Sequence, residues 1–153
     1  MTDARVDLLL AEDNPSDTEL ILESLSGLRE RVFTVEDGVE ALDFLFSRGR
    51  FGGRALSSMP RVVMFDVKLP KIGGFDVLRA LRADPRTRRI PVMMLTSSNL
   101  ERDVARGYEL GANSYVQKPV DFDRFRETVR LLGLYWLSIN EPPPLSTPRA
   151  EGT

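Results

Sequence analysis

The chain of 153 residues is long enough for one domain with a single core, and its 42% hydrophobic and 29% charged residues are ordinary values for a folded globular protein. A net charge of −2, without a basic stripe interleaved with aromatic residues, excludes the usual features of a nucleic-acid partner. The absence of Cys and His excludes disulfides, thiol and imidazole catalysis, and a phosphohistidine of its own. No signal peptide or membrane span is recognisable, so we expect a cytoplasmic protein without a membrane partner.

Strand-like and helix-like segments alternate along the whole chain. Short apolar runs predict strands, and each gap between them carries apolar residues at helical spacing. In chain order, the expected elements are strand 6–11, helix 15–27, strand 32–35, helix 39–46, strand 61–65, helix 74–83, strand 91–95, helix 100–110, strand 114–117 and a last helix over 122–139.

Local signals mark several of these boundaries. Asn14 is a capping residue and Pro15 fits the first turn of a helix, so a helix is expected to start directly after the first strand. The third helix should stop before Asp84–Pro85, because the residue before a proline disfavours helical geometry, and Gly111 should end the fourth. The Gly- and Arg-containing segment 47–60 predicts an exposed connector.

The strand-like runs lack polar alternation, which is typical of strands covered on both faces. The repeated strand–helix order therefore predicts an α/β fold with a parallel sheet, and right-handed crossovers place helices on both sides of it. We expect a three-layer, doubly wound (βα)5 sandwich with the flavodoxin-like strand order 2-1-3-4-5. In such sheets ligands bind at the carboxyl ends of the strands.

The last helix carries more apolar residues than the face of one sheet requires. Leu131, Leu134 and Tyr135 add apolar surface beside its inner stripe, which indicates either a deeper core with a folded-back tail or a self-association surface. We expect one domain over 1–140 and a disordered, proline-rich tail over 141–153. The expected inner stripe consists of Phe122, Phe125, Val129, Leu132, Trp136 and Ile139.

Polar residues follow the strands at the edge where a ligand is expected. Glu12 and Asp13 follow the first strand, and Asp66 follows the third. Thr96 comes after the fourth strand and Lys118 after the fifth. Taken alone, Glu12–Asp13 is also typical of a solvated loop beside a helix N-terminus, and Asp66 of a turn cap. Three acids in one cleft would repel each other, and a bound cation relieves that conflict.

An all-oxygen site without His or Cys favours magnesium over zinc. The same acids disfavour a nucleotide or flavin, and no glycine-rich phosphate loop follows the first strand. The set therefore predicts an aspartyl phosphate: Asp66 attacks in line, Lys118 and Thr96 contact the phosphoryl oxygens, and magnesium screens the charge. A lone Thr or Lys is more often structural, so both of these assignments depend on the acids.

Five segments in order match a known pattern: 8–14 (LLLAEDN), 37–42 (DGVEAL), 66–74 (DVKLPKIGG), 95–97 (LTS) and 111–119 (GANSYVQKP). Through them the chain, over about residues 6–139, resembles the receiver domain of two-component response regulators. The resemblance implies that Asp66 accepts a phosphoryl group from the phosphohistidine of a sensor histidine kinase. It also implies a signalling domain that catalyses only its own phosphotransfer and dephosphorylation, and is otherwise not an enzyme.

The resemblance implies that Mg²⁺ is bound directly by Asp13 and Asp66, through water by Glu12, and by the backbone carbonyl of Lys68. Two residues depart from the family pattern. Gly73 stands where the family often has Asp, which should affect the turn and not the chemistry. The Lys68 side chain places a cation beside the acceptor, so the lifetime of the phosphoryl group stays open.

A switch pair, Thr96 and Tyr115, is also implied by the resemblance. Phosphorylation would draw the hydroxyl of Thr96 inward, and the ring of Tyr115 would rotate to follow it. The alternative for Tyr115 is an ordinary half-buried aromatic residue on a strand. By the same resemblance, the peptide bond of Lys118–Pro119 is expected to be cis.

Finer features resemble the stand-alone regulators that pair with phytochrome kinases. They are segment 12–17, the long connector before the third strand, Asp84–Pro85 with 90–92, and the terminal segment 135–137. This resemblance implies a bacteriophytochrome kinase as partner and output through an unknown downstream protein. It further implies a homodimer formed through the fourth helix, the fifth strand and the extended last helix. The expected dimer interface contains Leu131, Leu134, Tyr135 and Trp136.

Two alternative functions remain. A haloacid-dehalogenase-like phosphatase also uses an aspartate nucleophile with magnesium, but its motif requires a second Asp where Lys68 stands. A receiver-like dimerisation scaffold that is never phosphorylated is disfavoured by the retained acids, Thr96 and Lys118. The sequence does not identify the kinase, the downstream target or the signal sensed, or say whether dimerisation depends on phosphorylation.

Overall fold

The computed structural model describes residues 6–55 and 59–144 of the chain. Five parallel strands form one sheet in the order β2-β1-β3-β4-β5, which confirms the predicted topology. The central strands β1, β3 and β4 are buried along their whole length, as expected for a sheet covered on both faces. The strands are β1 (Leu8–Ala11), β2 (Val32–Val35), β3 (Val62–Phe65), β4 (Val92–Thr96) and β5 (Ser114–Gln117).

Helices connect successive strands, and their starts follow the capping signals in the sequence. Asn14 Oδ1 accepts a hydrogen bond from the backbone N–H of Asp17 at 3.1 Å, and Asp37 Oδ1 accepts one from the N–H of Glu40 at 2.8 Å. The helices are α1 (Pro15–Ser24), α2 (Gly38–Leu45), α3 (Gly74–Ala83), α4 (Glu101–Glu109) and α5 (Phe122–Leu134). Two 3₁₀ segments, η1 (Arg29–Arg31) and η2 (Gly49–Phe51), and a π-helical segment, η3 (Tyr135–Ile139), complete the set.

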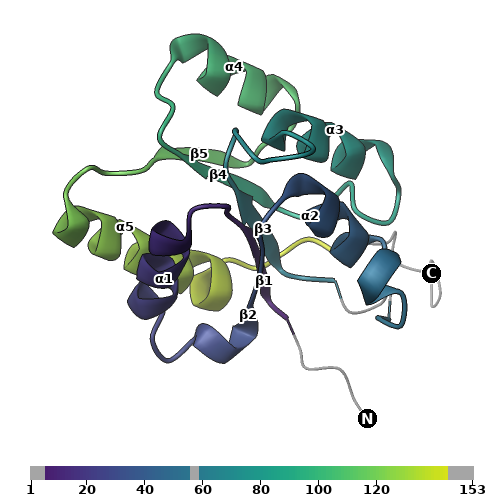
Figure 1. Cartoon of the computed structure of the whole chain (residues 1–153), viewed down its shortest axis with the longest axis horizontal. Helices are drawn as coiled ribbons and strands as arrows, with labels where there is room; N and C mark the ends of the chain where they lie inside the picture. Colours follow the sequence, from purple (N-terminus) through teal and green to yellow (C-terminus); the bar gives the residue numbers. More distant parts are fainter. Residues whose placement is uncertain (1–5, 56–58, 145–153) are drawn as a thin grey trace, which may run out of the picture.

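The three layers are visible in Figure 1, where α1 and α5 cover one face of the sheet and α2, α3 and α4 cover the other. Side chains of β1 alternate between these faces. Leu8 and Leu10 pack in the cluster that contains Ile21 of α1, whereas Leu9 and Ala11 pack in the cluster on the opposite face. Polar residues follow β1 and β3 at their carboxyl ends, where Glu12 and Asp66 are buried.

The connector between α2 and β3, predicted as an exposed loop, is partly packed. Its η2 segment places Phe51 in edge-on contact with Phe33 and Phe44, at centroid distances of 5.7 and 5.2 Å. Arg54 lies over the ring of Phe44 at 4.1 Å. These aromatic and cation–π contacts give a glycine-rich segment a fixed position that its composition alone does not predict.

The end of the last helix differs from the predicted stripe. Phe125, Val129 and Trp136 are buried as expected, but Phe122 and Ile139, at the two ends of the stripe, are 69% and 62% exposed. The change to π-helical bonding explains part of this difference, since Asn140 donates to the carbonyl of Tyr135 at 2.6 Å, five residues earlier. The wider turn brings both Trp136 and Leu137 into the core.

The end of η3 and the residue after it are held at the amino edge of the sheet. Arg31 Nη2 donates to the carbonyl of Leu137 at 3.1 Å, and Arg61 Nη2 donates to the carbonyl of Asn140 at 3.0 Å. Residues 141–144 carry no helix or strand, and the remainder of the predicted proline-rich tail lies outside the described residues. Over the described ranges, no helix is long and apolar enough to cross a membrane.

Candidate functional site

The site is centred on Asp66, which follows β3 at the carboxyl edge of the sheet. Thr96, the last residue of β4, donates its hydroxyl to Asp66 Oδ1 at 2.5 Å, and the backbone N–H of Lys68 donates to the same oxygen at 3.2 Å. Asp66 is only 8% exposed. The second carboxylate oxygen, Oδ2, accepts from the ammonium of Lys118 at 3.1 Å. The structure therefore brings together three residues that the sequence predicts from three different strand ends.

Lys118 is the centre of charge in this site. Its ammonium, 8% exposed at the side chain, contacts Glu12 Oε1 at 2.6 Å, Asp17 Oδ2 at 2.9 Å and Asp66 Oδ2 at 3.1 Å. Three carboxylates from β1, α1 and β3 thus share one cation. The arrangement relieves the repulsion that three neighbouring anions would otherwise cause.

Burial and ion pairing act in opposite directions on the titration of this cluster. Burial alone would lower the pKa of Lys118, but the hydrogen bonds to Glu12 and Asp17 and the charges of Glu12 and Asp66 outweigh it. The pKa of Lys118 therefore lies above its ordinary value. Burial raises the pKa of Glu12, and the hydrogen bond and charge of Lys118 offset only part of that rise. Lys118 consequently remains an ammonium at neutral pH and is a permanent donor toward Asp66.

Tyr115 lies on β5, and its hydroxyl donates to the backbone carbonyl of Ser98 at 2.9 Å. Burial raises the pKa of this hydroxyl, and the hydrogen bond to Ser98 offsets part of the rise. Ser98 in turn donates its backbone N–H to Thr96 Oγ1 at 3.3 Å. The predicted pair of Thr96 and Tyr115 is thus connected through a third residue that the sequence analysis does not single out.

Comparison with known proteins identifies the class of this site. Residues 8–130 match the family model of the response regulator receiver domain. The chain belongs to the response regulator receiver family. Receiver domains are signalling phosphoacceptors and not catalytic enzymes, so the match disfavours the phosphatase alternative.

One curated relative and three solved structures illustrate the likeness. The probable methanogenesis regulatory protein FilR2 of Methanothrix harundinacea is 39% identical over 139 residues, covering 89% of this chain and 86% of FilR2. The phosphorylated cyanobacterial phytochrome response regulator RcpA superposes with a TM-score of 0.84 at 33% identity, covering 92% of this chain and all of RcpA. The Mn²⁺-bound form of response regulator Rcp1 superposes with a TM-score of 0.82 at 30% identity, covering 90% of this chain and 98% of Rcp1. The bacteriophytochrome response regulator RtBRR superposes with a TM-score of 0.69 at 45% identity, covering 91% of this chain and 84% of RtBRR.

Receiver domains bind a divalent metal ion, and the residues of this chain fit one in the chemistry of their oxygen donors. The buried carboxylates of Glu12 and Asp66 already converge on one cation, the ammonium of Lys118. Asp13 does not join them: it is exposed beside the N-terminus of α1. Within the part of the chain that the structure describes, no three carboxylates are grouped as ligands for a metal ion. Asp17, and not Asp13, is the third acid around the cation in this structure.

Asp17 is the residue of this receiver cluster that the sequence analysis misses. It lies in the first turn of α1, and its carboxylate contacts the ammonium of Lys118 at 2.9 Å. An acidic residue in the first turn of a helix is a sequence signal, but it does not specify the direction of the side chain. The expected cis bond before Pro119 is also wrong, because no peptide bond among the described residues is cis. Trans is the intrinsically preferred form of a peptide bond before proline.

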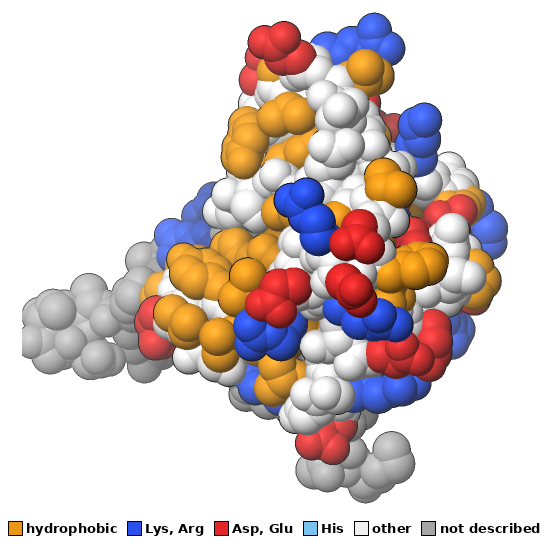
Figure 2. Space-filling model, turned by 90° about the vertical axis from the view of Figure 1, so that its left-hand side faces the viewer, with side chains coloured by type: hydrophobic (Ala, Val, Ile, Leu, Met, Phe, Trp, Pro, Cys, Tyr) orange, Lys and Arg blue, Asp and Glu red, His pale blue; other side chains and the backbone are white. Residues whose placement is uncertain are grey.

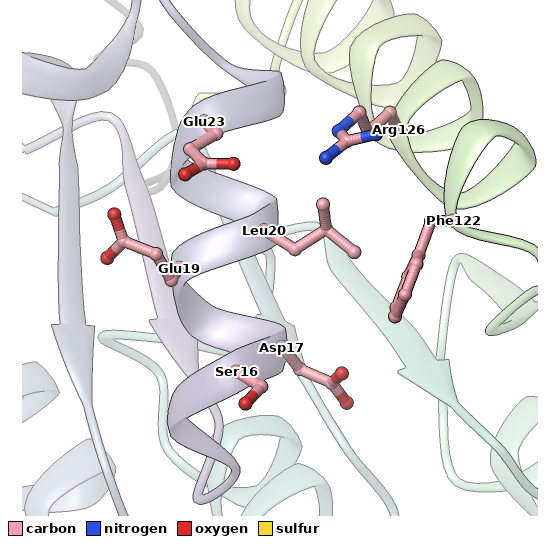
Figure 3. Close-up of a pocket in the computed structure, with 7 residues that line it drawn as sticks. All are labelled: Ser16, Asp17, Glu19, Leu20, Glu23, Phe122 and Arg126. Carbon is pink, nitrogen blue, oxygen red and sulfur yellow. The ribbon is translucent and has the colours of Figure 1, made fainter.

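A groove of about 310 Å³ between α1 and α5 opens beside the receiver site. Figure 3 shows Leu20 and Phe122 facing each other across it, with Arg126 pointing from α5 toward α1. Asp17 belongs both to this groove and to the cluster around Lys118. The groove thus combines apolar and acidic side chains with the guanidinium of Arg126. The groove is lined by Ser16, Asp17, Glu19, Leu20, Glu23, Phe122 and Arg126.

The residues expected at a dimer interface divide into two groups. Leu131, Leu134 and Tyr135 are 50%, 43% and 46% exposed. Figure 2 shows several hydrophobic patches on the side of the molecule that lies on the left in Figure 1. Trp136 is 9% exposed and packs in the core instead, with its ring edge-on to Tyr135 at 5.1 Å. A surface at the end of α5 is therefore present without Trp136 as a member.

Proposed function

We propose that this receiver domain accepts a phosphoryl group on Asp66 from the phosphohistidine of a sensor histidine kinase of the phytochrome type, and signals through protein contacts. The observation that supports it best is the environment of Asp66, whose two carboxylate oxygens face the hydroxyl of Thr96 and the ammonium of Lys118. These groups are the donors that phosphoryl oxygens require.

The transfer forms a bond between a carboxylate oxygen of Asp66 and phosphorus as the phosphorus–nitrogen bond of the donor histidine breaks. Lys118 and Thr96 then donate to oxygens of the phosphoryl group, because both already point their hydrogens at Asp66. Glu12 and Asp17 hold the ammonium in place through their own bonds to it. Burial of Asp66 keeps bulk water away from the acyl phosphate.

Magnesium is the proposed ion, since a hard cation with oxygen ligands and retained waters suits this donor set. Asp13, Asp66 and the backbone carbonyl of Lys68 would hold it directly, and Glu12 would hold it through water. When bound, it neutralises charge that develops on the transferred phosphoryl group. Asp13 and Lys68 are both exposed, so an ion in solution can reach them.

The phytochrome pairing rests on the relatives. RtBRR, whose name specifies a bacteriophytochrome, is 45% identical to this chain, and RcpA is a phytochrome response regulator. FilR2, at 39% identity, is named for a different process. Phosphotransfer from a panel of purified kinases compares these possibilities: the bacteriophytochrome kinase should transfer fastest, and faster transfer from another class would contradict the pairing.

The phosphoacceptor role is tested with acetyl phosphate, a small donor that requires no kinase. Incubation with acetyl phosphate and MgCl₂ should add one phosphoryl group to the wild type, as read by intact mass spectrometry. Asp66→Asn, which keeps the shape of the side chain and removes the nucleophile, should add none. Equal labelling of both proteins would contradict Asp66 as acceptor, and equal labelling of the wild type after chelation with EDTA would contradict the role of the metal ion.

We also propose that the receiver forms a homodimer through the exposed apolar residues at the end of α5. Leu131, Leu134, Tyr135 and Ile139 form a cluster of large side chains between 43% and 62% exposed. Exposed apolar side chains close together on one helix end favour association. The downstream partner is a protein of unknown identity.

A further inference from the structure

The ammonium of Lys118 belongs to a closed ring of hydrogen bonds that joins the end of β1 to the first turn of α1. Lys118 Nζ donates to Glu12 Oε1 at 2.6 Å, and Glu12 Oε2 accepts from the backbone N–H of Asn14 at 3.1 Å. Asn14 Oδ1 in turn accepts from the N–H of Asp17 at 3.1 Å. Asp17 Oδ2 closes the ring, because it accepts from Lys118 Nζ at 2.9 Å. Each member of the ring is therefore held at two points.

The first turn of α1 gives the carboxylate of Asp17 a rigid support. Asn14 caps the helix, and Pro15 occupies its first position, where the ring of the proline fixes φ. The N–H of Thr18 also donates to the carbonyl of Asn14 at 3.0 Å. Figure 3 shows the carboxylates of Asp17 and Glu19 on different sides of α1. Asp17 is thus directed toward the buried cluster, whereas Glu19 is exposed.

Neutralisation of charge does not explain the presence of Asp17. Glu12 and Asp66 already outnumber the one ammonium, so Asp17 adds a further anion that repels both of them. What Asp17 adds is a direction. A lysine ammonium carries three hydrogens, and Glu12, Asp17 and Asp66 supply one acceptor for each. With all three hydrogens bonded, the ammonium has a single defined orientation.

We propose that Asp17 is a positioning residue for phosphoryl acceptance, which fixes the ammonium of Lys118 beside Asp66 through a hold that depends on the cap by Asn14. The inference rests on the proposed phosphoacceptor function. The contact of the ammonium with Asp66 is the longest of the three, at 3.1 Å, so the other two carboxylates set its position. An ammonium that is oriented beforehand needs no rearrangement when phosphoryl oxygens arrive. Without Asp17, one hydrogen loses its acceptor and the ammonium takes up a wider range of positions.

The first experiment measures how fast acetyl phosphate labels the protein in MgCl₂, by intact mass, over a range of acetyl phosphate concentrations. Asp17→Ala should lower the rate at saturating acetyl phosphate about tenfold, the factor expected for the loss of one hydrogen bond to a charged group. The half-saturating concentration should change little, because the lost interaction orients the site and does not bind the donor. Glu19→Ala is the matched control, since it removes an exposed acid from the same helix and should label at the wild-type rate.

The dependence on the helix cap is tested at Asn14. Asn14→Ala removes the oxygen that accepts from the N–H of Asp17, so the first turn loosens and the labelling rate should fall about threefold. Asn14→Ser restores a capping oxygen and should recover the wild-type rate. A normal rate in Asn14→Ala would show that the hold does not depend on the cap and would contradict that part of the proposal.

Two measurements on the unphosphorylated protein separate positioning from a merely structural role. In urea unfolding, the midpoint of Asp17→Ala should equal that of Glu19→Ala, because the lost attraction to Lys118 is offset by relief of repulsion from two neighbouring acids. In nitrogen-15 NMR, the ammonium of Lys118 should give a resolved signal in the wild type and in Glu19→Ala. That signal should broaden or disappear in Asp17→Ala, since the ammonium is then no longer fixed.

The outcomes that overturn the proposal differ from those that overturn the phosphoacceptor function. Asp17→Ala that labels as fast as Glu19→Ala, or that keeps the ammonium signal of the wild type, overturns the role of Asp17. A midpoint of Asp17→Ala well below that of Glu19→Ala makes the effect structural and overturns it as well. If the wild type itself gains no mass, the phosphoacceptor function fails, and the role of Asp17 in acceptance fails with it. Labelling of the wild type therefore distinguishes the two failures.

Discussion

Replacement of Lys118 by methionine removes the ammonium that Glu12, Asp17 and Asp66 share, while it keeps most of the apolar stem. Removing one partner of a buried ion pair costs about 3–5 kcal/mol, because the remaining charges stay buried without compensation. The side chains of Glu12 and Asp66 are 3% and 11% exposed, whereas that of Asp17 is 26% exposed and gains some hydration. We therefore expect a loss of about 3 kcal/mol, at the lower end of this range.

Urea unfolding measures this loss through intrinsic fluorescence. The chain has a single tryptophan, and Trp136 is buried in the core, so its emission reports global unfolding. Lys71→Met is the control, because the ammonium of Lys71 is 65% exposed at the side chain and its pair with Asp37 is longer, at 3.3 Å. The control should lose less than about 1 kcal/mol. Added MgCl₂ should recover part of the loss in Lys118→Met, since an ion that binds the folded state stabilises it.

The loss in Lys118→Met should also depend on pH. The pKa of Glu12 is raised by burial even in the wild type, and removal of the ammonium takes away the bond and charge that oppose this rise. A carboxyl group whose pKa is raised in the folded state contributes its full stability at pH values below its pKa in the unfolded chain, 4.5. That contribution is lost as the pH rises through the pKa of the group in the folded state. The deficit should therefore be small in acid and grow from pH 4.5 toward neutral. A deficit below about 1 kcal/mol at neutral pH, or one that does not change with pH, would refute this reasoning.

Two further predictions concern backbone packing and association. Gly74→Ala places a methyl group 2.2 Å from the carbonyl oxygen of Asp66, so it should destabilise the domain by about 1–3 kcal/mol in urea unfolding. Gly53→Ala, whose added methyl meets nothing within 4 Å, should change stability little, and equal effects of the two would contradict the packing argument. Leu134→Glu should turn a dimer into a monomer in sedimentation velocity and change stability by less than about 0.5 kcal/mol, because Leu134 is 43% exposed. A wild type that is monomeric at all concentrations tested would contradict the proposed interface.

The core of the site follows from the sequence because parallel strands present their carboxyl ends at one edge. That rule places Asp66, Thr96 and Lys118 at one edge without knowledge of any helix, and the structure has them within hydrogen-bonding distance there. Asp17 does not follow from it, since it lies on a helix. The direction of its side chain depends on the rotation of α1 about its axis, which packing of Leu20 and Ile21 against the sheet decides.

The end of the last helix is a second place where local pattern and tertiary packing diverge. A regular helix would place Trp136 and Ile139 on one face, and the sequence analysis uses that spacing. The π-helical turn adds a residue and moves Leu137 inward beside Trp136, leaving Ile139 exposed. Bonds from Arg31 and Arg61 to carbonyls of this segment stabilise the altered path, and such long-range contacts leave no periodic signal in the sequence.

The position of Ser98 shows a similar limit. A serine in a loop after a strand has no distinctive spacing, and its bonds to Thr96, Asp103 and Tyr115 arise only when β4, α4 and β5 are assembled. The sequence indicates Thr96 and Tyr115 as two separate residues. It does not indicate the connection between them.

The most direct test of the account locates the phosphoryl group on the chain. After incubation with acetyl phosphate and MgCl₂, reduction with borohydride converts an aspartyl phosphate to homoserine, and mass spectrometry of peptides identifies the converted residue. The account predicts homoserine at position 66 and at no other acid of the cluster. Conversion of Glu12, Asp13 or Asp17, with Asp66 left intact, would contradict it.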